Sequence, residues 1–498
     1  MHLSTLQFMG WLALSSVVAS SDPTMSTCKT LSVALPDEVF FPETDSYNAS
    51  VLSYPFVQLR LESTCIVRPK TTHDVVTIIT TLNESNRTRF AIKGGGHNAN
   101  VGFNNIRDGV TIDMQGLKTV EVARGNEVVR VGAGALGQDV YDVVQKHNLT
   151  ILGPRIGMVG VAGFTTGGGI GFLSPEKGWA CDAVVNFEVV LASGEIVNAN
   201  ATSRVDLYTA LKGGQSNFGT VTRFDLKTFP QGPIWGGRIA YAANASAGLI
   251  SAYTKFKDPE NYDPYASGWV TIGYNHTVAK FAPVSILWYT KPQLKPGALG
   301  GIINAGSHVT NGMIEAPINE HTRNASRGVA AAAARRTIWA TTTFHISPTI
   351  LHRIHSFWAD LIPEICETHA EANVAAELTF QSLPPSPSSD SHPNSLGFAH
   401  NETPEKNIVF VQVVFLYSDG AATVGLEKAL KDLVERINEL ADDEGLAHKF
   451  RYMNFAAWFQ NPLGGYGKKQ KKTLREVAQK YDPKGMFQKQ LAGGFKLF

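Results

Sequence analysis

The residues best suited to chemistry form a short run, Lys93-Gly94-Gly95-Gly96-His97, between two apolar stretches that read as strands. Glycine has no Cβ, so three glycines in succession let backbone N–H groups approach an anionic group closely. A histidine directly after such a loop is placed to touch whatever the loop holds. A second glycine-rich run extends from Gly153 to Gly171. Two such loops in one unit predict a large ligand that carries a pyrophosphate.

A third glycine-rich run, Gly132-Ala133-Gly134-Ala135-Leu136-Gly137, matches the G-x-G-x-x-G pattern of dinucleotide-binding Rossmann units. That interpretation requires an acidic residue about 20 positions further on. No Asp or Glu occurs between Asp142 and Glu176. We therefore interpret this run as a tight strand-to-helix turn, whose backbone can still line a ligand.

The elements that must hold these loops alternate between strands and helices. Residues 72–82 place apolar side chains at helical spacing, and residues 110–114 and 184–192 read as buried strands. Ser193-Gly194-Glu195 is typical of a hairpin turn. Pro230-Gln231-Gly232-Pro233 then breaks the pattern and predicts a domain boundary.

The middle of the chain has a different pattern. Strand-like runs occur at 234–241, 268–274, 279–289, 337–345 and 409–417, and helical patterns at 247–257, 328–336, 348–370 and 426–441. This order predicts an antiparallel sheet covered by helices, so the fold class is α+β. The chain is also too long for a single core.

Several short motifs resemble one family. The Lys93–His97 loop resembles the first cofactor loop of the vanillyl-alcohol-oxidase superfamily, in its berberine-bridge-enzyme-like branch of FAD-linked oxidases. The order and spacing of the motifs carry the resemblance, which covers most of the chain and is closest to fungal secreted members. The other motifs are Ile66-Val67-Arg68-Pro69, Gly178-Trp179-Ala180-Cys181-Asp182, Ala210-Leu211-Lys212-Gly213-Gly214, Asn217-Phe218-Gly219-Thr220-Val221-Thr222 and Tyr452-Met453-Asn454-Phe455.

The sequence pattern and the resemblance together indicate the domain organisation. We expect a signal peptide at 1–20, an N-terminal arm at 21–62, a PCMH-type FAD-binding domain at 63–233, a substrate domain at 234–425, and a C-terminal segment at 426–498 that returns to the FAD-binding domain.

The resemblance also implies that His97 is joined covalently to the 8α-methyl carbon of FAD. The chemistry is sound, because a neutral imidazole nitrogen is a nucleophile and oxidised flavin is electrophilic at that methyl group. The alternative is a histidine that only hydrogen-bonds beside the loop. Further cofactor contacts carry over by position to Gly94, Gly95, Gly96, Gly157, Val159, Gly160, Gly163, Gly167, Gly168, Gly169, Val221 and Asn454.

Two positions in the second loop refine this expectation. Many family members carry a second covalent link through a cysteine, but Ile156 stands at that position, so we expect a single link. Val159 matches the position that gates oxygen access to the flavin in the family. A valine there resembles oxidases rather than dehydrogenases.

The catalytic base is not assigned by these motifs. Family members use a tyrosine or a carboxylate near the flavin, but two usual tyrosine positions hold Ala99 and Phe455. Tyr452, Tyr141 and Gln412 remain as candidates, each with a structural role as the alternative, and acidic residues and histidines of the middle domain stay open. His352 and His355 have helical spacing but no evident third ligand, so no metal is expected.

The implied reaction removes a hydride from a C–H bond next to oxygen or nitrogen in a small-molecule substrate. Oxygen then reoxidises the flavin and gives hydrogen peroxide. We favour a fungal secondary metabolite as substrate, with a carbohydrate or an alcohol as the alternative. Two other classes stay open: a catalytically inactive glycan-binding flavoprotein, motivated by the missing tyrosines, and a dehydrogenase with another electron acceptor.

Several features predict secretion. The apolar residues 1–20 read as a signal peptide, with an ordinary helix as the alternative. Cys28 and Cys65 flank the first segment and are expected to form a disulfide, while Cys181 and Cys366 are expected to be buried free thiols. Glycosylation sequons begin at Asn48, Asn83, Asn86, Asn148, Asn200, Asn244, Asn275, Asn324 and Asn401.

Composition excludes other classes of partner. A net charge of +1 argues against nucleic acid. Apolar residues make up 43% of the chain and charged residues 17%, as in ordinary globular proteins. No later apolar run reaches about 18 residues, so we expect no membrane span. The oligomeric state is not indicated.

Overall fold

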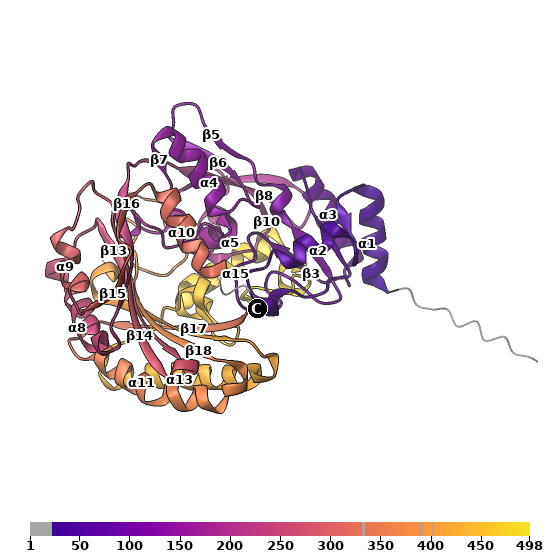
Figure 1. The fold of residues 1–498 in the computed structure, drawn as a ribbon. Helices are drawn as coiled ribbons and strands as arrows, with labels where there is room; N and C mark the ends of the chain where they lie inside the picture. The colour runs from indigo at the N-terminus through magenta and orange to yellow at the C-terminus, as the bar shows by residue number, and fades with distance from the viewer. Residues whose placement is uncertain (1–21, 331–333, 389–390, 401) are drawn as a thin grey trace, which may run out of the picture.

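The computed structural model describes residues 22–330, 334–388, 391–400 and 402–498. The expected signal peptide and the sequon at Asn401 lie outside the described residues. The chain forms two parts that face each other (Figure 1). The N-terminal half builds two small sheets and a two-stranded pair at 149–150 and 229–230, and a large sheet with helices on its outer side makes up the other part.

The first small sheet has the order β1-β2-β4-β3, formed by β1 (Val39–Phe40), β2 (Cys65–Val67), β4 (Val110–Asp113) and β3 (Phe90–Lys93). Strands β2, β4 and β3 are parallel. Helix α3 (Thr72–Ser85) connects β2 to β3 and begins with a capping box between Thr71 and Asp74. The Cys28–Cys65 disulfide joins α1 (Pro23–Ala34) to this sheet, as predicted.

The second small sheet is antiparallel throughout and has the order β5-β6-β10-β8-β9. Its strands are β5 (Val120–Val122), β6 (Val128–Gly132), β10 (Thr220–Lys227), β8 (Val184–Val190) and β9 (Ile196–Asn200). The hairpin at Gly194 is confirmed. Because β6 has only antiparallel neighbours, the glycine run after it is no Rossmann unit.

The large sheet is antiparallel, in the order β15-β12-β14-β13-β18-β19-β17-β20, with β16 beside β12. Its strands are β12 (Ile234–Tyr241), β13 (Ala266–Asn275), β14 (Lys280–Tyr289), β15 (His308–Asn311), β16 (Ile314–Ala316), β17 (Arg336–His345), β18 (Ala375–Ser382), β19 (Ile408–Tyr417) and β20 (Ala447–His448). Helices α8 (Ser246–Phe256), α11 (Ile350–Thr368) and α13 (Thr423–Asp443) cover its outer face (Figure 1). The predicted α+β fold is confirmed.

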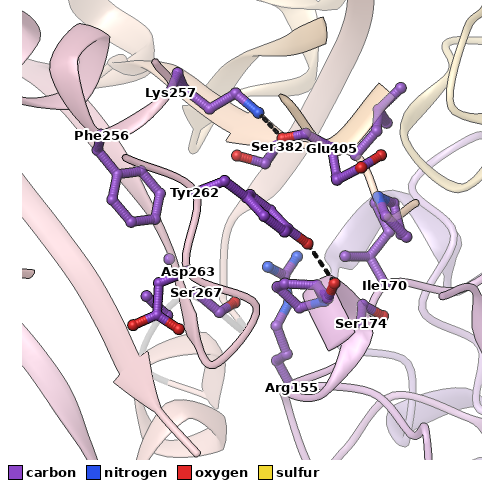
Figure 2. Close-up of a pocket in the computed structure, with 15 residues that line it drawn as sticks. Arg155, Ile170, Ser174, Phe256, Lys257, Tyr262, Asp263, Ser267, Ser382 and Glu405 are labelled. Carbon is purple, nitrogen blue, oxygen red and sulfur yellow. Dashed lines mark hydrogen bonds between the residues drawn. The ribbon is translucent and has the colours of Figure 1, made fainter. Parts of the chain in front are cut away.

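The inner face of the large sheet packs on the first part of the molecule. Trp269, Ile286, Trp288 and Phe410 belong to the same hydrophobic core as the two small sheets. A pocket lies between the two parts, with Ser174 on one side and Phe256 on the other (Figure 2). The functional residues of both parts can therefore meet at this junction.

The remaining elements connect these layers. They are α2 (Asp45–Leu52), α4 (Gly137–Val144), β7 (Leu149–Thr150), α5 (Val161–Thr166), α6 (Ser174–Lys177), α7 (Val205–Gly214), β11 (Phe229–Pro230), α9 (Gly297–Ile303), α10 (Ile318–Ala330), α12 (Pro404–Asn407), α14 (Pro462–Gly465), α15 (Lys468–Tyr481) and α16 (Met486–Lys489). Within the described ranges, no helix combines the length and apolarity needed to cross a lipid bilayer.

Three expectations differ from the structure. The helix predicted at 328–336 is wrong, because α10 ends at Ala330 and Arg336 already pairs with β19. Strand β18 was not expected, since its Ala-Ala-Glu-Leu start favours a helix and pairing on both edges overrides that preference. The C-terminal segment returns to the first core later than residue 426, because α13 buries its apolar face on the large sheet. Cys181 and Cys366 are free and buried, as predicted.

Candidate active site

The glycine-rich loops touch each other directly. A Cβ atom added at Gly95 would lie under 3.0 Å from the Gly160 nitrogen, and a Cβ atom added at Gly160 would lie equally close to the Gly95 nitrogen. The third run joins them, because Gly137 N–H donates to the Val159 carbonyl at 2.9 Å and Val161 N–H donates to the Ala135 carbonyl at 3.0 Å. We call loops 94–97, 132–137 and 156–163 together the glycine cradle. Backbone N–H groups in loops of this kind suit a pyrophosphate.

His97 lies at the end of the glycine cradle. Its ring is 5.8 Å from the ring of Phe56. Its Nδ1 atom is buried and has no hydrogen-bond partner in the described part of the chain. Burial lowers the pKa of His97 to about 4, so the imidazole is neutral near pH 7. A buried polar atom without a partner is costly, so a group placed against this nitrogen would relieve that cost.

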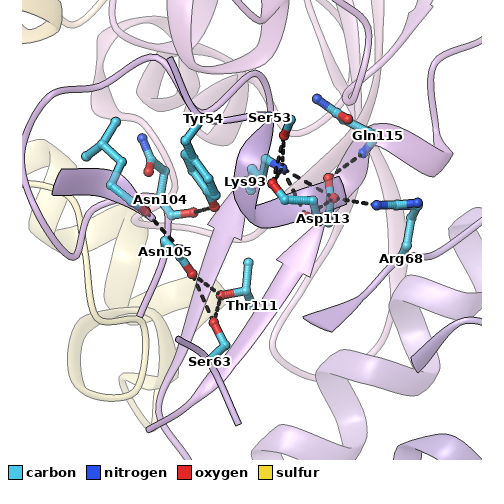
Figure 3. Close-up of polar contacts among 12 residues, drawn as sticks. Ser53, Tyr54, Ser63, Arg68, Lys93, Asn104, Asn105, Thr111, Asp113 and Gln115 are labelled. Carbon is cyan, nitrogen blue, oxygen red and sulfur yellow. Dashed lines mark hydrogen bonds and ion pairs between the residues drawn. The ribbon is translucent and has the colours of Figure 1, made fainter. Parts of the chain in front are cut away.

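A buried charge cluster holds the strand end before the loop (Figure 3). Lys93 is fully buried and lies opposite Asp113 in the β3–β4 pairing. Its Nζ donates to the Ser50 carbonyl at 2.9 Å, pairs with Asp113 at 3.4 Å, and lies 4.5 Å from the centre of the Tyr54 ring. Arg68 also pairs with Asp113, at 3.2 Å. Burial lowers the pKa of Lys93, and Asp113 opposes that shift.

The C-terminal segment supplies the opposite wall of the site. Asn454 Nδ2 donates to the Phe164 carbonyl at 3.0 Å and to the Tyr452 hydroxyl at 3.1 Å. Gly167 must lack a side chain, because a Cβ there would lie under 3.0 Å from the Asn454 Oδ1. Burial raises the pKa of Tyr452 to about 12. Tyr452 therefore keeps its proton near pH 7.

Gln412 lies on the inner face of the large sheet. It is directly opposite Thr341 on β17 and Thr379 on β18. Its strand neighbours on this face are Phe410, whose ring is 5.6 Å from that of Tyr452, and Val414, which packs in the small cluster that contains Phe56. The fold thus brings Gln412, Tyr452 and the surroundings of His97 together. Tyr141 lies elsewhere, packed in the core of the first part with its ring 6.4 Å from that of Phe172.

The other expected cofactor positions surround the cradle. Val159 is half-buried in the second loop, and Gly163 lies within α5. Gly168 and Gly169 have positive φ angles, where the chain turns beside Trp179 and Ala180. Val221 lies beyond the last β6–β10 pair, at a register shift in β10. Gly157 N–H donates to the Thr322 carbonyl at 3.2 Å, which ties the second loop to α10.

The sequence alone did not point to Gln381 and Glu377, two polar residues at the junction of the two parts. The Arg155 guanidinium donates to the Gln381 Oε1 at 2.8 Å. Glu377 lies on the same inner face, opposite Val414, and burial raises the pKa of Glu377 while Arg238 and Arg335 oppose the shift. Gln381 and Glu377 lie four positions apart on β18 and therefore on the same face. A prediction of that strand would have placed both of them on the inner face of the sheet. Among the described residues, no three His, Cys, Asp or Glu side chains are grouped to hold a metal ion.

Comparisons with known proteins agree with this geometry. Residues 63–200 match the family model for an FAD binding domain. The chain is 31% identical over 472 residues to the FAD-dependent monooxygenase drtC of Aspergillus calidoustus, with 93% of this chain and 88% of that protein covered. It is 30% identical over 473 residues to the FAD-dependent monooxygenase sdcF of Emericella nidulans, with 94% and 98% covered.

Solved structures share the fold at low identity. The xylooligosaccharide oxidase of Myceliophthora thermophila superposes with a TM-score of 0.73 at 18% identity, covering 95% of this chain and 100% of that one. A variant of berberine bridge enzyme superposes with a TM-score of 0.70 at 14% identity, with 95% and 100% covered. The chain therefore belongs to the family of FAD-linked oxidoreductases that contains the two fungal monooxygenases, and it has the berberine-bridge-enzyme-like fold. It is an FAD-dependent oxidoreductase of the fungal secondary-metabolite type.

The residues of this site fit FAD. The lack of side chains at Gly95 and Gly160 lets the backbones of the first two loops meet, and backbone N–H groups of such glycine-rich loops would hold a pyrophosphate. His97 offers a neutral ring nitrogen at one end of the cradle. Asn454 is held rigidly on the far side by Phe164. The glycine cradle would hold the pyrophosphate, and His97 and Asn454 would hold the flavin ring.

Proposed function

We propose that the protein is an oxidase that holds FAD through one covalent bond to His97. The buried, unpartnered Nδ1 of His97 at the end of the glycine cradle supports the link most directly. When bound at this site, FAD would supply the hydride acceptor, with oxygen as the final oxidant. The net reaction converts a substrate H–C–XH group, with X oxygen or nitrogen, and O2 into C=X and H2O2. The proposed substrate is a small secondary metabolite.

The inner face of the large sheet would receive that substrate. Gln412 has an amide, which neither takes nor gives a proton, so its role is to orient the substrate by hydrogen bonds. Tyr452 stays protonated and acts as a donor. Glu377 is the carboxylate that the described strands place on this face, and it is the group there best suited to accept the proton released from X–H.

The acid-precipitation test addresses the covalent link. Purified protein is precipitated with acid, and the yellow colour is expected to stay in the pellet. His97→Ala is expected to release its flavin to the supernatant, and mass spectrometry should find the flavin on the peptide that contains His97. Flavin released from the wild-type protein would contradict the covalent link. If the reduced enzyme stays colourless in air, oxygen does not reoxidise the flavin, and the proposal of an oxidase is contradicted.

Monooxygenation is the second candidate function, because the fungal relatives are named FAD-dependent monooxygenases. The two reactions differ in the fate of oxygen. An oxidase puts both atoms of O2 into hydrogen peroxide, whereas a monooxygenase puts one atom into the product. Turnover under 18O2, with peroxide and product mass both measured, decides between them. We expect peroxide equal to product and no label in the product.

We further propose that the protein is secreted and glycosylated. The Cys28–Cys65 disulfide supports this, because disulfides persist in oxidising compartments. The sequons add to the argument, since six of them expose their asparagine on the surface.

A further inference from the structure

Three amide side chains join the His97 loop, strand β17 and the segment that follows Asn454 to one another. Gln58 and Asn100 are buried, and Gln460 is half-buried. Each of the three amides bonds to backbone groups, and each connects a different pair of these segments. We call the three side chains together the amide triangle.

Gln58 connects the His97 loop to β17. Its Nε2 donates to the Ala99 carbonyl at 3.3 Å and to the Thr337 carbonyl at 2.7 Å. Its Oε1 accepts from the Thr337 N–H at 3.3 Å. The amide fits only this way round, because its oxygen faces an N–H group and its nitrogen faces two carbonyl oxygens. Since Ala99 is the second residue after His97, this contact holds the end of the loop.

Gln460 makes a similar bridge from the C-terminal segment. Its Nε2 donates to the Thr341 carbonyl at 2.6 Å, and its Oε1 accepts from the N–H groups of Thr341 at 3.1 Å and Ala457 at 3.0 Å. Thr341 lies opposite Gln412 in the β17–β19 register. The segment that follows Asn454 is therefore tied to the row of the large sheet that contains Gln412.

Asn100 closes the triangle. Its Nδ2 donates to the Ala456 carbonyl at 2.9 Å, and its Oδ1 accepts from the Trp458 N–H at 2.9 Å. Ala456 is the second residue after Asn454. The His97 loop and the segment after Asn454 are thus joined directly as well as through β17.

Strand β17 has an edge that these amides complete. It pairs with β19 along 336–345, whereas in the described chain β20 pairs with it only at Thr343 and Phe344. Backbone groups of alternate residues point to the same edge of a strand, so those of Thr337 and Thr341 share the edge on which β20 lies. An open edge leaves backbone N–H and C=O groups unpaired. The two glutamine amides take the place of the missing strand neighbour.

We propose that Gln58, Asn100 and Gln460 are positioning residues, which fix the flavin relative to the inner face of the large sheet. This role rests on the proposed function, because His97 and Asn454 are the residues that would hold the flavin ring. The amides act through those two residues and touch only the backbone. Transfer between two bound groups is sensitive to a misplacement of about 1 Å, so a small shift of either segment matters.

Two measurements on the purified holoenzyme test the amide triangle. Visible circular dichroism reports how the bound flavin ring is held, and hydrogen exchange followed by mass spectrometry reports on each backbone segment without use of the flavin. Gln460→Met keeps the length of the side chain but removes the amide. We expect at least a twofold loss of the flavin dichroism, and at least tenfold faster exchange in peptides from β17 and from the segment after Asn454.

The companion variant Gln58→Met is expected to give the same loss of dichroism, with faster exchange in β17 and in the His97 loop. Gln460→Glu keeps the oxygen that accepts two hydrogen bonds and loses the donor, so intermediate changes are expected. If a methionine variant fails to fold, Gln460→Glu decides.

Gln490→Met is the matched control. Gln490 is buried, and its Nε2 donates to the carbonyls of Leu82 at 3.0 Å and Thr88 at 3.3 Å. The variant removes contacts of the same kind before the start of β3. It should leave the flavin dichroism and the exchange in β17 unchanged.

Two results would overturn the positioning role: a flavin dichroism in Gln460→Met equal to that in Gln490→Met, or faster exchange that is confined to β17. Failure of the proposed function is separate, because acid precipitation tests the link to His97. Flavin that acid releases, but that loses its dichroism in Gln460→Met, would refute the covalent link and support the triangle. A protein purified without flavin would refute the proposed function, and exchange in the three segments would still decide whether the amides hold them together.

Discussion

The cluster around Lys93 shows how single buried charges are accommodated beside the glycine cradle. Lys93 and Asp113 are both fully buried, and each has further polar contacts, through Ser50 and Arg68. A buried pair adds little net stability compared with an apolar pair, but removal of one partner leaves an uncompensated charge. The cluster therefore fixes the end of β3, where the His97 loop starts.

Lys93→Met is expected to lower the free energy of unfolding by about 1–3 kcal/mol, because Asp113 loses a buried hydrogen-bond partner while Arg68 stays paired with it. Flavin loading is expected to fall as well, since the loop loses its anchor. Urea unfolding and the absorbance ratio of flavin to protein measure the two effects. Lys428→Met is the control, because Lys428 and Asp432 form an exposed ion pair on α13. A loss no larger than that of the control would refute the anchoring role.

Asp182 gives a pH-dependent prediction. Burial raises the pKa of Asp182 from 3.8 to about 6, against the opposing effects of Lys212 and Asn394. Between these values the folded state keeps a proton that the unfolded state has lost, so this residue makes the protein less stable as the pH rises from 4 to 6. Asp182→Asn removes this pH-dependent contribution to the free energy of unfolding. Its free energy of unfolding relative to wild type should improve by about 2–3 kcal/mol between pH 4 and pH 7.

Equilibrium unfolding of both proteins at several pH values measures this difference, in which the contributions of all other groups largely cancel. A constant difference between the two proteins from pH 4 to pH 7 would show that the Asp182 carboxyl titrates normally in the folded state.

At the scale of elements, the site depends on backbone contact between loops that are far apart in the sequence. Gly95 follows β3 and Gly160 precedes α5, and neither has room for a Cβ. The Gly132–Gly137 turn supports both by hydrogen bonds to the second loop. The cradle is thus a property of three loops together, and a change in one of them displaces the others.

Gly95→Ala is expected to separate the first two loops and to reduce FAD binding at least tenfold, because the new methyl group overlaps the Gly160 backbone. Flavin content of the purified protein measures the effect. Gly300→Ala in α9 is the matched control, since a Cβ there meets no atom within 4 Å. It should leave flavin content unchanged and raise stability by up to about 1 kcal/mol, because alanine favours helices. Full flavin content in Gly95→Ala would contradict the cradle.

For the whole molecule, the junction of the two parts decides which residues can work together. His97 and Asn454 belong to opposite ends of the chain, and Gln412 comes from the large sheet that lies between them in sequence. Both hydrophobic cores must form before these side chains face one another. The outer surface, in contrast, carries the glycosylation sequons on which the proposed secretion can be tested.

Glycan occupancy is expected to follow exposure and hydrogen bonding. Asn83 and Asn200 are half-buried, and their Nδ2 atoms donate to the Ala192 carbonyl at 3.0 Å and the Asn186 Oδ1 at 3.1 Å. We expect both to lack glycans. The exposed sequons, which are expected to carry them, are Asn48, Asn86, Asn148, Asn244, Asn275 and Asn324. Peptide mapping of secreted protein after enzymatic deglycosylation measures occupancy. Modification of Asn200 would contradict the argument from hydrogen bonds, and unmodified exposed sequons would contradict secretion.

The parts that the sequence predicted are local. The glycine runs, the capping box before α3 and the hairpin at Gly194 need only neighbouring residues, because backbone conformation and capping act over a few positions. The resemblance in the motifs added the expectation that His97 links the cofactor, which stays a prediction. The amphipathic helix that became α13 was equally readable from its apolar face.

Tertiary structure alone decided the rest. Lys93 and Asp113 meet because β3 and β4 are parallel neighbours, and Arg155 meets Gln381 across 226 residues. Glu377 faces the site because pairing with β13 and β19 makes a strand of a segment with little strand preference of its own. Such contacts depend on register and packing between distant segments, and these are set by the burial of both cores rather than by any local pattern.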